Sequence, residues 1–242
     1  MTRLCDRWKC LPVVAALAWF VCQLVRPGVA PKGNRVPTKP RAYHIVIDLR
    51  DGYAVRPELA SPGEKFADMI VRLKPYAAIT GTYYDENGHL LGDLLLDGRL
   101  LCRGPSRQGI GFTKDGQVLF LERRGKRQID WRGCVSGISC GPRLIRAGKL
   151  DLNPKRDGFS ETALIRKAPR CAIGATRDGK LVMCAVSEWV TVRQLANYML
   201  QLGASDAVNL DGGAMTAFYA RGKTLADPVL PMNNVLTVFQ KQ

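Results

Sequence analysis

The chain has 242 residues, of which 46% are hydrophobic and 24% are charged, and its formal net charge is +15. This composition supplies a substantial core and excludes a disordered chain. The charge favours anionic partners, but there is no zinc-finger spacing, no RNA-binding aromatic motif and no single basic stripe, so we expect no nucleic-acid partner.

The first 30 residues predict a signal peptide or an N-terminal membrane anchor. Three basic residues precede an apolar run, LPVVAALAWFVCQLV, from Leu11 to Val25. Residues 28–30, Gly-Val-Ala, are acceptable as a cleavage site, whereas the nearby Arg26 favours an uncleaved anchor. The run is shorter than the ~20 residues typical of a membrane span. Both alternatives predict an exported protein, either periplasmic or anchored in the membrane and facing outside the cytoplasm.

Residues 31–42 predict a basic, proline-rich linker, because they contain three prolines and four basic residues. One domain is expected to follow over residues 43–242. It begins with YHIVIDL, whose alternating pattern predicts a strand. The next segment, SPGEKFADMIVRLKP, predicts a helix with Ser61 as N-cap, Pro62 at its first position, Glu64 closing a capping box and Pro75 ending it.

Glycine-containing turns then separate short apolar runs. The turns are ENG, LDG, KDG and RDG, and each predicts a hairpin. A second helix is predicted from Thr191, which forms a capping box with Gln194, to the stop at Gly203. After it, Asp211-Gly212 in AVNLDGGAMTAFY is again a strong hairpin signal. This order predicts an α+β fold with mixed, mostly antiparallel sheets and hairpins flanked by a few helices, rather than a βαβ repeat.

Five cysteines follow the leader, so at least one must lack a partner within the domain. Cys134 and Cys140 flank VSGIS and could close a small loop, whereas Cys184 in KLVMCAV is typical of a buried strand residue with an inert thiol. The sequence has no CxxC pair and no EF-hand loop. We therefore expect no obligatory metal and no cofactor.

Five segments, in order along the chain, together resemble the phosphodiester glycosidase domain family. They are ITGTYYD, CGPRLIRAGKL, RCAIGATRDGKL, NLDGGAMTAF and PMNNVL. This is the family of the uncovering enzyme that removes N-acetylglucosamine from mannose 6-phosphate diesters, so the resemblance implies a hydrolase acting on sugars in phosphodiester linkage. The sequence departs from the family pattern in two places. Thr80 replaces an asparagine, and Ala214-Met215 replaces the usual Gly-Ser.

Glycoside hydrolysis commonly uses two carboxyl groups around an oxocarbenium-like transition state. A phosphate leaves as a stable anion, so one carboxylate acting as base or nucleophile can suffice when arginine neutralises the leaving charge. Asp211 is the first catalytic candidate, because Gly212 and Gly213 would leave it accessible at a strand end. Asp85 in YYDENG is the second, with a plain turn as the alternative.

The candidates for substrate binding come from the same five segments. Arg143 and Arg170 would hold a phosphate, since arginine binds phosphate through two parallel hydrogen bonds. Asn209 would bond a sugar hydroxyl or Asp211. The remaining expected substrate-binding residues are Gly81, Thr82, Gly212, Gly213, Thr216 and Asn234.

The sequence thus predicts an exported glycosidase that hydrolyses a sugar from a phosphodiester or a phosphorylated envelope glycan. Asp211 would be the base or nucleophile, and the arginines would clamp the phosphate. One alternative is a non-catalytic, glycan-binding envelope protein that serves exopolysaccharide assembly. Another is a metal-dependent phosphodiesterase. In the first two cases the partner is a carbohydrate.

Overall fold

A computed structural model of the chain describes residues 41–241, apart from the side chains of residues 163 and 164. The predicted leader or anchor lies outside the described residues, as does all but the end of the predicted linker. The first strand begins at Ala42, one residue before the predicted start of the domain. Within the described residues, no helix is both long enough and apolar enough to cross a bilayer.

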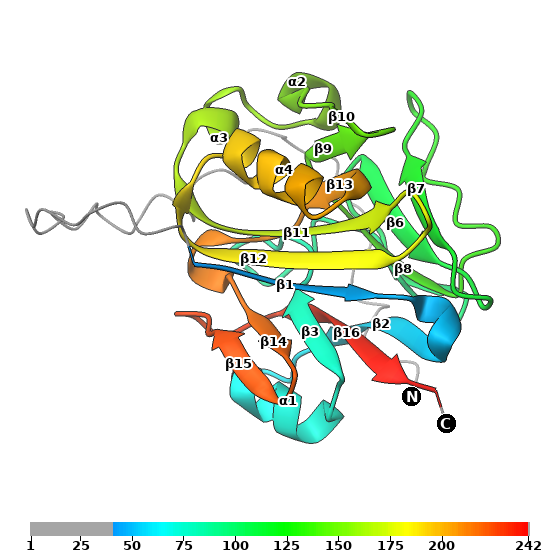
Figure 1. Cartoon of the computed structure of the whole chain (residues 1–242), viewed down its shortest axis with the longest axis vertical. Helices are drawn as coiled ribbons and strands as arrows, with labels where there is room; N and C mark the ends of the chain where they lie inside the picture. The colour runs from blue at the N-terminus through cyan, green and yellow to red at the C-terminus, as the bar shows by residue number, and fades with distance from the viewer. Residues whose placement is uncertain (1–40, 242) are drawn as a thin grey trace, which may run out of the picture.

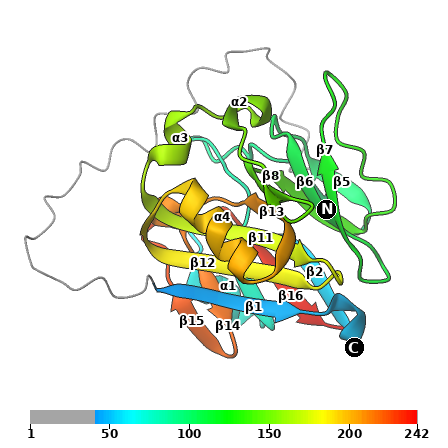
Figure 2. The same cartoon turned by 45° about the horizontal axis from the view of Figure 1, so that its top comes forward.

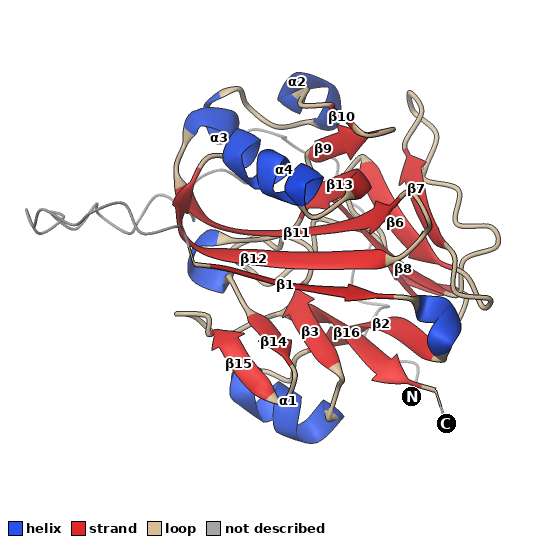
Figure 3. Ribbon diagram, viewed as in Figure 1, coloured by secondary structure: helices blue, strands red, loops and turns tan. Residues whose placement is uncertain are grey.

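Three antiparallel sheets form the structure (Figures 1 and 3). In spatial order, the six-stranded sheet contains β1 (Ala42–Ile47), β12 (Leu181–Val190), β11 (Ala168–Thr176), β13 (Ala204–Asn209), β9 (Arg143–Arg146) and β10 (Lys149–Leu150). The second sheet contains β15 (Lys223–Ala226), β14 (Phe218–Ala220), β3 (Ala77–Thr80), β16 (Asn234–Gln240) and β2 (Tyr53–Leu59). The third contains β5 (Arg99–Cys102), β4 (Leu94–Leu96), β8 (Ser136–Cys140), β6 (Gln108–Phe112) and β7 (Val118–Glu122).

The helices are short and lie around the sheets. They are α1 (Phe66–Leu73), α2 (Pro154–Asp157), α3 (Thr162–Ile165) and α4 (Val192–Gln201), with 3-10 turns η2 (Leu49–Asp51) and η3 (Gly213–Met215). Figure 2 shows α4 lying across the six-stranded sheet. The predicted α+β class, with mostly antiparallel sheets and few helices, is confirmed.

Strand β12 shows how the core is divided. Leu181, Met183 and Ala185 point into a central cluster shared by all three sheets, whereas Val182 and Cys184 point into a second cluster under α4. Side chains alternate between the two faces of a strand, and this strand is apolar on both because both faces are covered. The predicted burial of Cys184 is confirmed, and burial raises the pKa of its thiol to about 12.

Local signals predicted α4 and several hairpins correctly. Thr191 and Gln194 form the full capping box of α4, and Gly203 follows its end with a positive φ of 83°. Strands β11 and β12 form the antiparallel hairpin predicted from the RDG turn, and the LDG and KDG turns join β4 to β5 and β6 to β7.

The predicted start of α1 is wrong. The Ser61 N–H donates to the Glu64 carboxylate (2.8 Å), as a capping box requires, but Gly63 has a φ of 77°, which interrupts the helical path. The helix begins only at Phe66, after Lys65, whose side chain makes no capping bond. Its end agrees with the prediction, since Lys74 adopts the left-handed conformation just before Pro75.

Two other predictions also need correction. The Asp211 segment is not a hairpin turn, because β13 before it belongs to the six-stranded sheet and β14 after it belongs to the second sheet. Cys134 and Cys140 do not form a loop-closing disulfide. Both are free thiols, and they lie in different hydrophobic clusters at either end of the extended strand β8.

Candidate active site

The corner that contains Asp211 lies where strands from all three sheets end. Asp211 follows β13, and its N–H donates to the carbonyl of Gly81, which follows β3 (3.2 Å). Gly141, which follows β8, donates its N–H to the carbonyl of Asn209 (3.0 Å). Segments that are far apart in the sequence are thereby joined around one carboxylate.

Asp211 is partly buried, and burial raises the pKa of its carboxyl from 3.8 to about 7. The Gly212 N–H donates to Oδ1 (2.8 Å) and opposes this shift. Burial is the main cause that raises the pKa values of four neighbouring groups, and the charge of Asp211 raises them further, so these groups lie near it: Tyr83, Tyr84, Cys140 and Cys171. Among the described residues, no arginine or lysine forms an ion pair with Asp211. A carboxyl with a pKa near 7 can exchange protons at neutral pH.

Two tyrosines that we did not predict as site residues flank this carboxyl. Tyr83 Oη bonds the carbonyl oxygens of Gly141 (2.8 Å) and Leu210 (3.2 Å), and burial raises the pKa of Tyr83 well above its usual value. Tyr84 Oη bonds Met215 Sδ (3.0 Å), and burial raises its pKa to about 12. Both hydroxyls therefore stay protonated at neutral pH. Their place directly after Gly81 and Thr82 in the ITGTYYD segment was the available signal.

Asn209 fixes the position of Tyr83. Its Nδ2 donates to Tyr83 Oη (2.5 Å) and to the carbonyl of Leu210 (2.6 Å). Asn209 is 1% exposed, and its Oδ1 has no hydrogen-bond partner within residues 41–241. A buried acceptor without a partner is costly and marks a place where a ligand or a water can bind. Thr216, also predicted as a site residue, is buried beside the Cys171 thiol.

Gly81, Thr82 and Asn234 form a clamp that holds the loop after β3. The Asn234 carboxamide pairs with the Thr82 backbone, accepting from its N–H (2.7 Å) and donating to its carbonyl (2.9 Å). A Cβ at Gly81 would lie 1.8 Å from Asn234 Oδ1, so only glycine fits there. These three predicted binding residues meet at the corner, where they contact one another and the scaffold.

Each of the two positions after Asp211 requires glycine for a different structural reason. A Cβ at Gly212 would lie 2.9 Å from the carbonyl oxygen of Pro169, and Gly213 has a positive φ of 63°. Thr80, which replaces the family's asparagine, accepts from the Ala217 N–H (2.9 Å) and donates to the Met215 carbonyl (2.6 Å). It therefore ties the end of β3 to the segment that follows Asp211.

Asp85, the second catalytic candidate, is held within a turn. It accepts from the backbone N–H groups of Asn87 (2.9 Å) and His89 (2.8 Å), and its other oxygen lies 2.8 Å from His89 Nδ1. These hydrogen bonds outweigh burial and lower the pKa of Asp85. Both carboxylate oxygens are engaged in the turn, which is the alternative that the sequence left open.

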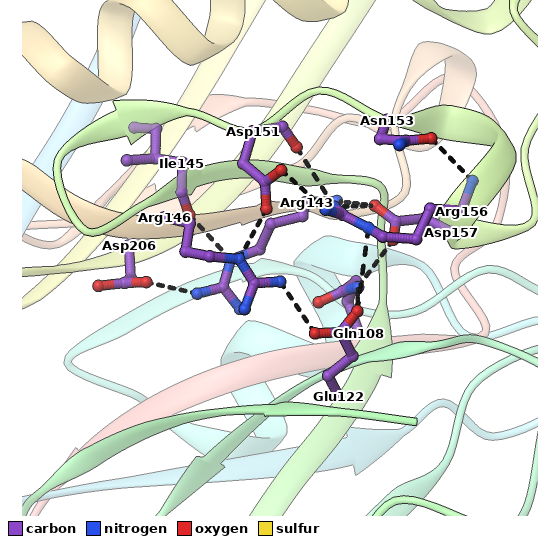
Figure 4. Close-up of polar contacts among 10 residues, drawn as sticks. All are labelled: Gln108, Glu122, Arg143, Ile145, Arg146, Asp151, Asn153, Arg156, Asp157 and Asp206. Carbon is purple, nitrogen blue, oxygen red and sulfur yellow. Dashed lines mark hydrogen bonds and ion pairs between the residues drawn. The ribbon is translucent and has the colours of Figure 1, made fainter. Parts of the chain in front are cut away.

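Arg143, which was predicted to bind phosphate, is engaged in contacts inside the fold. Its side chain is 3% exposed, pairs with Asp206, donates to the Ile145 carbonyl (2.8 Å) and lies over the ring of Phe120. Figure 4 shows it within a network of arginines and carboxylates around β9 and α2. Desolvation lowers the pKa of Arg143 despite the Asp206 charge. The guanidinium therefore stabilises the fold at this position.

Arg170 lies at the Asp211 corner. Its Nη2 donates to the carbonyl of Arg166 (2.6 Å), and its positive charge partly opposes the rise that burial causes in the pKa of Tyr83. A Cβ at Gly212 would lie 3.3 Å from the Arg170 Cα. Of the two arginines predicted to bind phosphate, Arg170 is thus the one whose backbone lies beside Gly212 and whose charge acts on Tyr83.

A cleft of about 430 Å³ opens next to this corner, and Tyr84 forms part of its wall. Asp211 is not among the residues that line it. Within residues 41–241, no group of three His, Cys, Asp or Glu side chains is arranged to hold a metal ion.

Comparison with known proteins identifies relatives of the whole described region. The family model for phosphodiester glycosidase matches residues 74–239. The N-acetylglucosamine-1-phosphodiester alpha-N-acetylglucosaminidase of Mus musculus is 24% identical over 234 residues, covering 88% of this chain and 44% of that protein. The Homo sapiens protein of the same name is 24% identical over 168 residues, 61% of this chain and 32% of that protein. The chain thus spans less than half the length of these relatives.

Solved structures share the fold. The catalytic domain of the zebrafish N-acetylglucosamine-1-phosphodiester alpha-N-acetylglucosaminidase, auto-inhibited by its pro-peptide, matches with a TM-score of 0.65 and 19% identity, covering 87% of this chain and 86% of that one. A hypothetical protein from Synechocystis matches with a TM-score of 0.71 and 18% identity, covering 83% of this chain and 59% of that one.

Proposed function

The chain belongs to the phosphodiester glycosidase family, and on this premise we propose that it hydrolyses a sugar from a phosphodiester or a phosphorylated envelope glycan. The names of its relatives describe enzymes that act on N-acetylglucosamine in phosphodiester linkage, which supports this substrate class. The observation that carries the proposal is the position of Asp211. It is a partly buried carboxyl near Tyr83 and Tyr84, where the strands of three sheets end, and the charge of Arg170 acts on Tyr83.

Asp211 serves as the base or nucleophile of the reaction. Its ionised form either removes a proton from the attacking water or attacks the anomeric carbon directly. The bond that breaks joins the anomeric carbon to the phosphate oxygen, and the electron pair leaves with the phosphate. This leaving group is already a stable anion, so a second carboxyl in the position predicted for Asp85 is not required.

Arg170 supplies positive charge to the departing phosphate, since a guanidinium forms strong, charge-assisted hydrogen bonds with phosphate oxygens. Backbone carbonyl groups orient its side chain, as the contact with Arg166 illustrates (2.6 Å). The protonated hydroxyls of Tyr83 and Tyr84 provide neutral hydrogen-bonding groups for the sugar. Asn209 positions Tyr83.

Turnover of a defined substrate tests the proposal. The purified chain is incubated with an N-acetylglucosaminyl phosphodiester, and released reducing sugar is measured for wild type, Asp211→Asn and the matched control Asp85→Asn. Removing a carboxylate that acts in the chemical step is expected to lower kcat/KM by about 10³-fold or more. Asp85→Asn is expected to stay within about threefold of wild type, because Asp85 supports a turn. Circular dichroism checks folding, and full turnover by Asp211→Asn would contradict the proposal.

One observation favours a second candidate, a non-catalytic glycan-binding protein. Met215 stands where the family has serine, and its sulfur accepts a hydrogen bond from Tyr84 (3.0 Å). The hydroxyl that a serine would contribute is missing at this place. Calorimetry that detects glycan binding, together with no released sugar after long incubation, would favour this candidate over hydrolysis.

We extend the proposal to location, with the chain exported by its first 30 residues. Three basic residues followed by the apolar run from Leu11 to Val25 support this. Cell fractionation of the full chain tests it, and recovery in the cytoplasm at full length would contradict it. An N-terminal sequence determined on the exported protein would separate cleavage after Ala30 from an uncleaved anchor.

A further inference from the structure

The cleft beside Tyr84 is formed by three loops that are distant in the sequence. The loops comprise residues 60–63, 84–88 and 231–233, and they enclose about 430 Å³. Asn233 joins them, because its carbonyl accepts from the Ala60 N–H (2.9 Å) and its Nδ2 donates to the Gly88 carbonyl (2.9 Å). The Glu64 carboxylate fixes the loop at Ser61 and is itself held by Arg72 (2.7 Å). The cleft is thus preformed, as small-molecule sites usually are.

The walls of the cleft are polar but uncharged. Although 24% of the residues in the chain are charged, none of the ten residues that line this cleft is an acid or a base that is ionised at neutral pH. Its polar side chains are the Ser61 hydroxyl, the Asn87 and Asn233 carboxamides and the Tyr84 phenol. The Asn87 carboxamide is exposed and has no hydrogen-bond partner within residues 41–241. Hydroxyl and carboxamide groups both donate and accept, as the neighbouring hydroxyls of a sugar require.

The side chains that line the cleft favour one class of ligand over two others. A phosphate or an anionic polymer requires lysine or arginine, which these walls lack. A purely apolar ligand would leave the Asn87 carboxamide without a partner. An uncharged sugar ring satisfies the amides with its hydroxyls and can pack against the Tyr84 ring and the prolines at positions 62 and 231.

Tyr84 connects this cleft to the Asp211 corner. Its ring lines the cleft, and its hydroxyl bonds Met215 Sδ (3.0 Å) and the Pro231 carbonyl (3.2 Å). The Asp211 charge acts on the same hydroxyl, although Asp211 itself does not line the cleft. A ring in the cleft therefore meets Tyr84 and not the reacting carboxylate.

We propose that this cleft binds an uncharged sugar ring adjacent to the sugar that reacts at Asp211, so that the preferred substrate carries at least two sugar units. The inference rests on the proposed function, and it concerns the extent of the substrate rather than the bond that breaks. Met215, which replaces the family's serine, helps to fix Tyr84 in the wall of the cleft through this contact.

Binding to the full chain carrying Asp211→Asn tests this subsite without turnover. The probes are N-acetylglucosamine and three uncharged trisaccharides: β1,4-linked N-acetylglucosamine, α1,4-linked glucose and α1,6-linked mannose. Affinities are measured by calorimetry and ligand-observed NMR. At least one trisaccharide is expected to bind about 10-fold or more tightly than the monosaccharide, since a second occupied subsite adds on the order of 1.4 kcal/mol. If no trisaccharide gains over the monosaccharide, the inference is overturned.

Variants then test whether the gain in trisaccharide affinity comes from the cleft. Ser61→Trp fills the cleft mouth and is expected to reduce trisaccharide affinity to that of the monosaccharide. Thr224→Trp, on the exposed strand β15, makes a matched change elsewhere and is expected to leave binding unchanged. Asn87→Ala removes only an exposed carboxamide and is expected to weaken trisaccharide binding about threefold. A gain that persists in both Ser61→Trp and Asn87→Ala would place the sugar elsewhere and contradict the subsite.

These results separate the subsite from the proposed function. If wild type never releases sugar but the trisaccharide gain disappears in Ser61→Trp, the hydrolase proposal fails and the subsite remains. If wild type hydrolyses the phosphodiester but no trisaccharide gains affinity, the hydrolase proposal stands and the subsite fails.

Discussion

Replacing Asp211 with asparagine should remove activity and yet stabilise the folded protein at alkaline pH. Burial raises the pKa of this carboxyl from 3.8 to about 7, so between these values the folded state keeps a proton that the unfolded state has lost. Wild-type stability therefore falls as the pH rises through this window, and the loss is complete above the folded pKa. This pKa shift lowers the free energy of unfolding by about 4 kcal/mol at pH 8 but by only about 1.5 kcal/mol at pH 5. Because the carboxylate keeps some contact with solvent, both free energies are upper limits.

The assay is urea unfolding of wild type and Asp211→Asn at pH 5 and pH 8. Asparagine resembles the protonated carboxyl and keeps an oxygen that accepts from the Gly212 N–H. Groups common to both proteins cancel, so the stability gained by the variant should be larger at pH 8 than at pH 5, by up to about 2.5 kcal/mol.

Asp85→Asn is a control for which the expected change in stability at pH 8 has the opposite sign. The pKa of Asp85 is lowered in the folded state, so its charge stabilises above the unfolded pKa and its removal should destabilise the protein at pH 8. A gain for Asp211→Asn that is equal at both pH values, or a loss at pH 8, would refute the reasoning about the buried carboxyl.

Three further substitutions test the structural roles. Arg143→Ala should cost about 3 kcal/mol in urea unfolding, because it removes a buried guanidinium together with its bonds to Asp206 and the Ile145 carbonyl; an unchanged stability with a raised KM for substrate would instead support phosphate binding. Gly81→Ala places a methyl group 1.8 Å from Asn234 Oδ1, and the resulting cost of about 2 kcal/mol should lower the melting temperature by about 4–8 °C; an unchanged melting curve would argue against the clamp. Tyr83→Phe removes the hydroxyl that Asn209 positions and should lower kcat about tenfold with KM within about threefold; a raised KM at unchanged kcat would assign Tyr83 to ground-state binding.

The sequence predicted those elements whose determinants are local. The Thr191 and Gln194 capping box and the RDG hairpin depend on residues a few positions apart, and both occur as expected. The start of α1 differs because Gly63 adopts a positive φ that leaves the Ser61 turn outside the helix. The predicted and observed starts of α1 differ in the φ of one residue, and the composition of the segment alone does not predict that angle.

The candidate site depends on contacts that are distant in the sequence, and there prediction was less complete. Arg143 and Arg170 occur in similar motif contexts, but Asp206 lies 63 positions from Arg143 and binds its guanidinium inside the fold. Asp211-Gly212 satisfies the local requirements of a hairpin, yet the strands on either side enter different sheets. Tyr84 acquires its place next to Asp211 only through the meeting of those sheets.

The position of bond cleavage tests the central claim most directly. Hydrolysis of the phosphodiester by the wild-type chain in heavy-oxygen water, followed at once by mass spectrometry of both products, identifies the atom that water attacks. Attack at the anomeric carbon beside Asp211 predicts label in the released sugar and none in the phosphate. Label in the phosphate would contradict the glycosidase mechanism and indicate a phosphodiesterase.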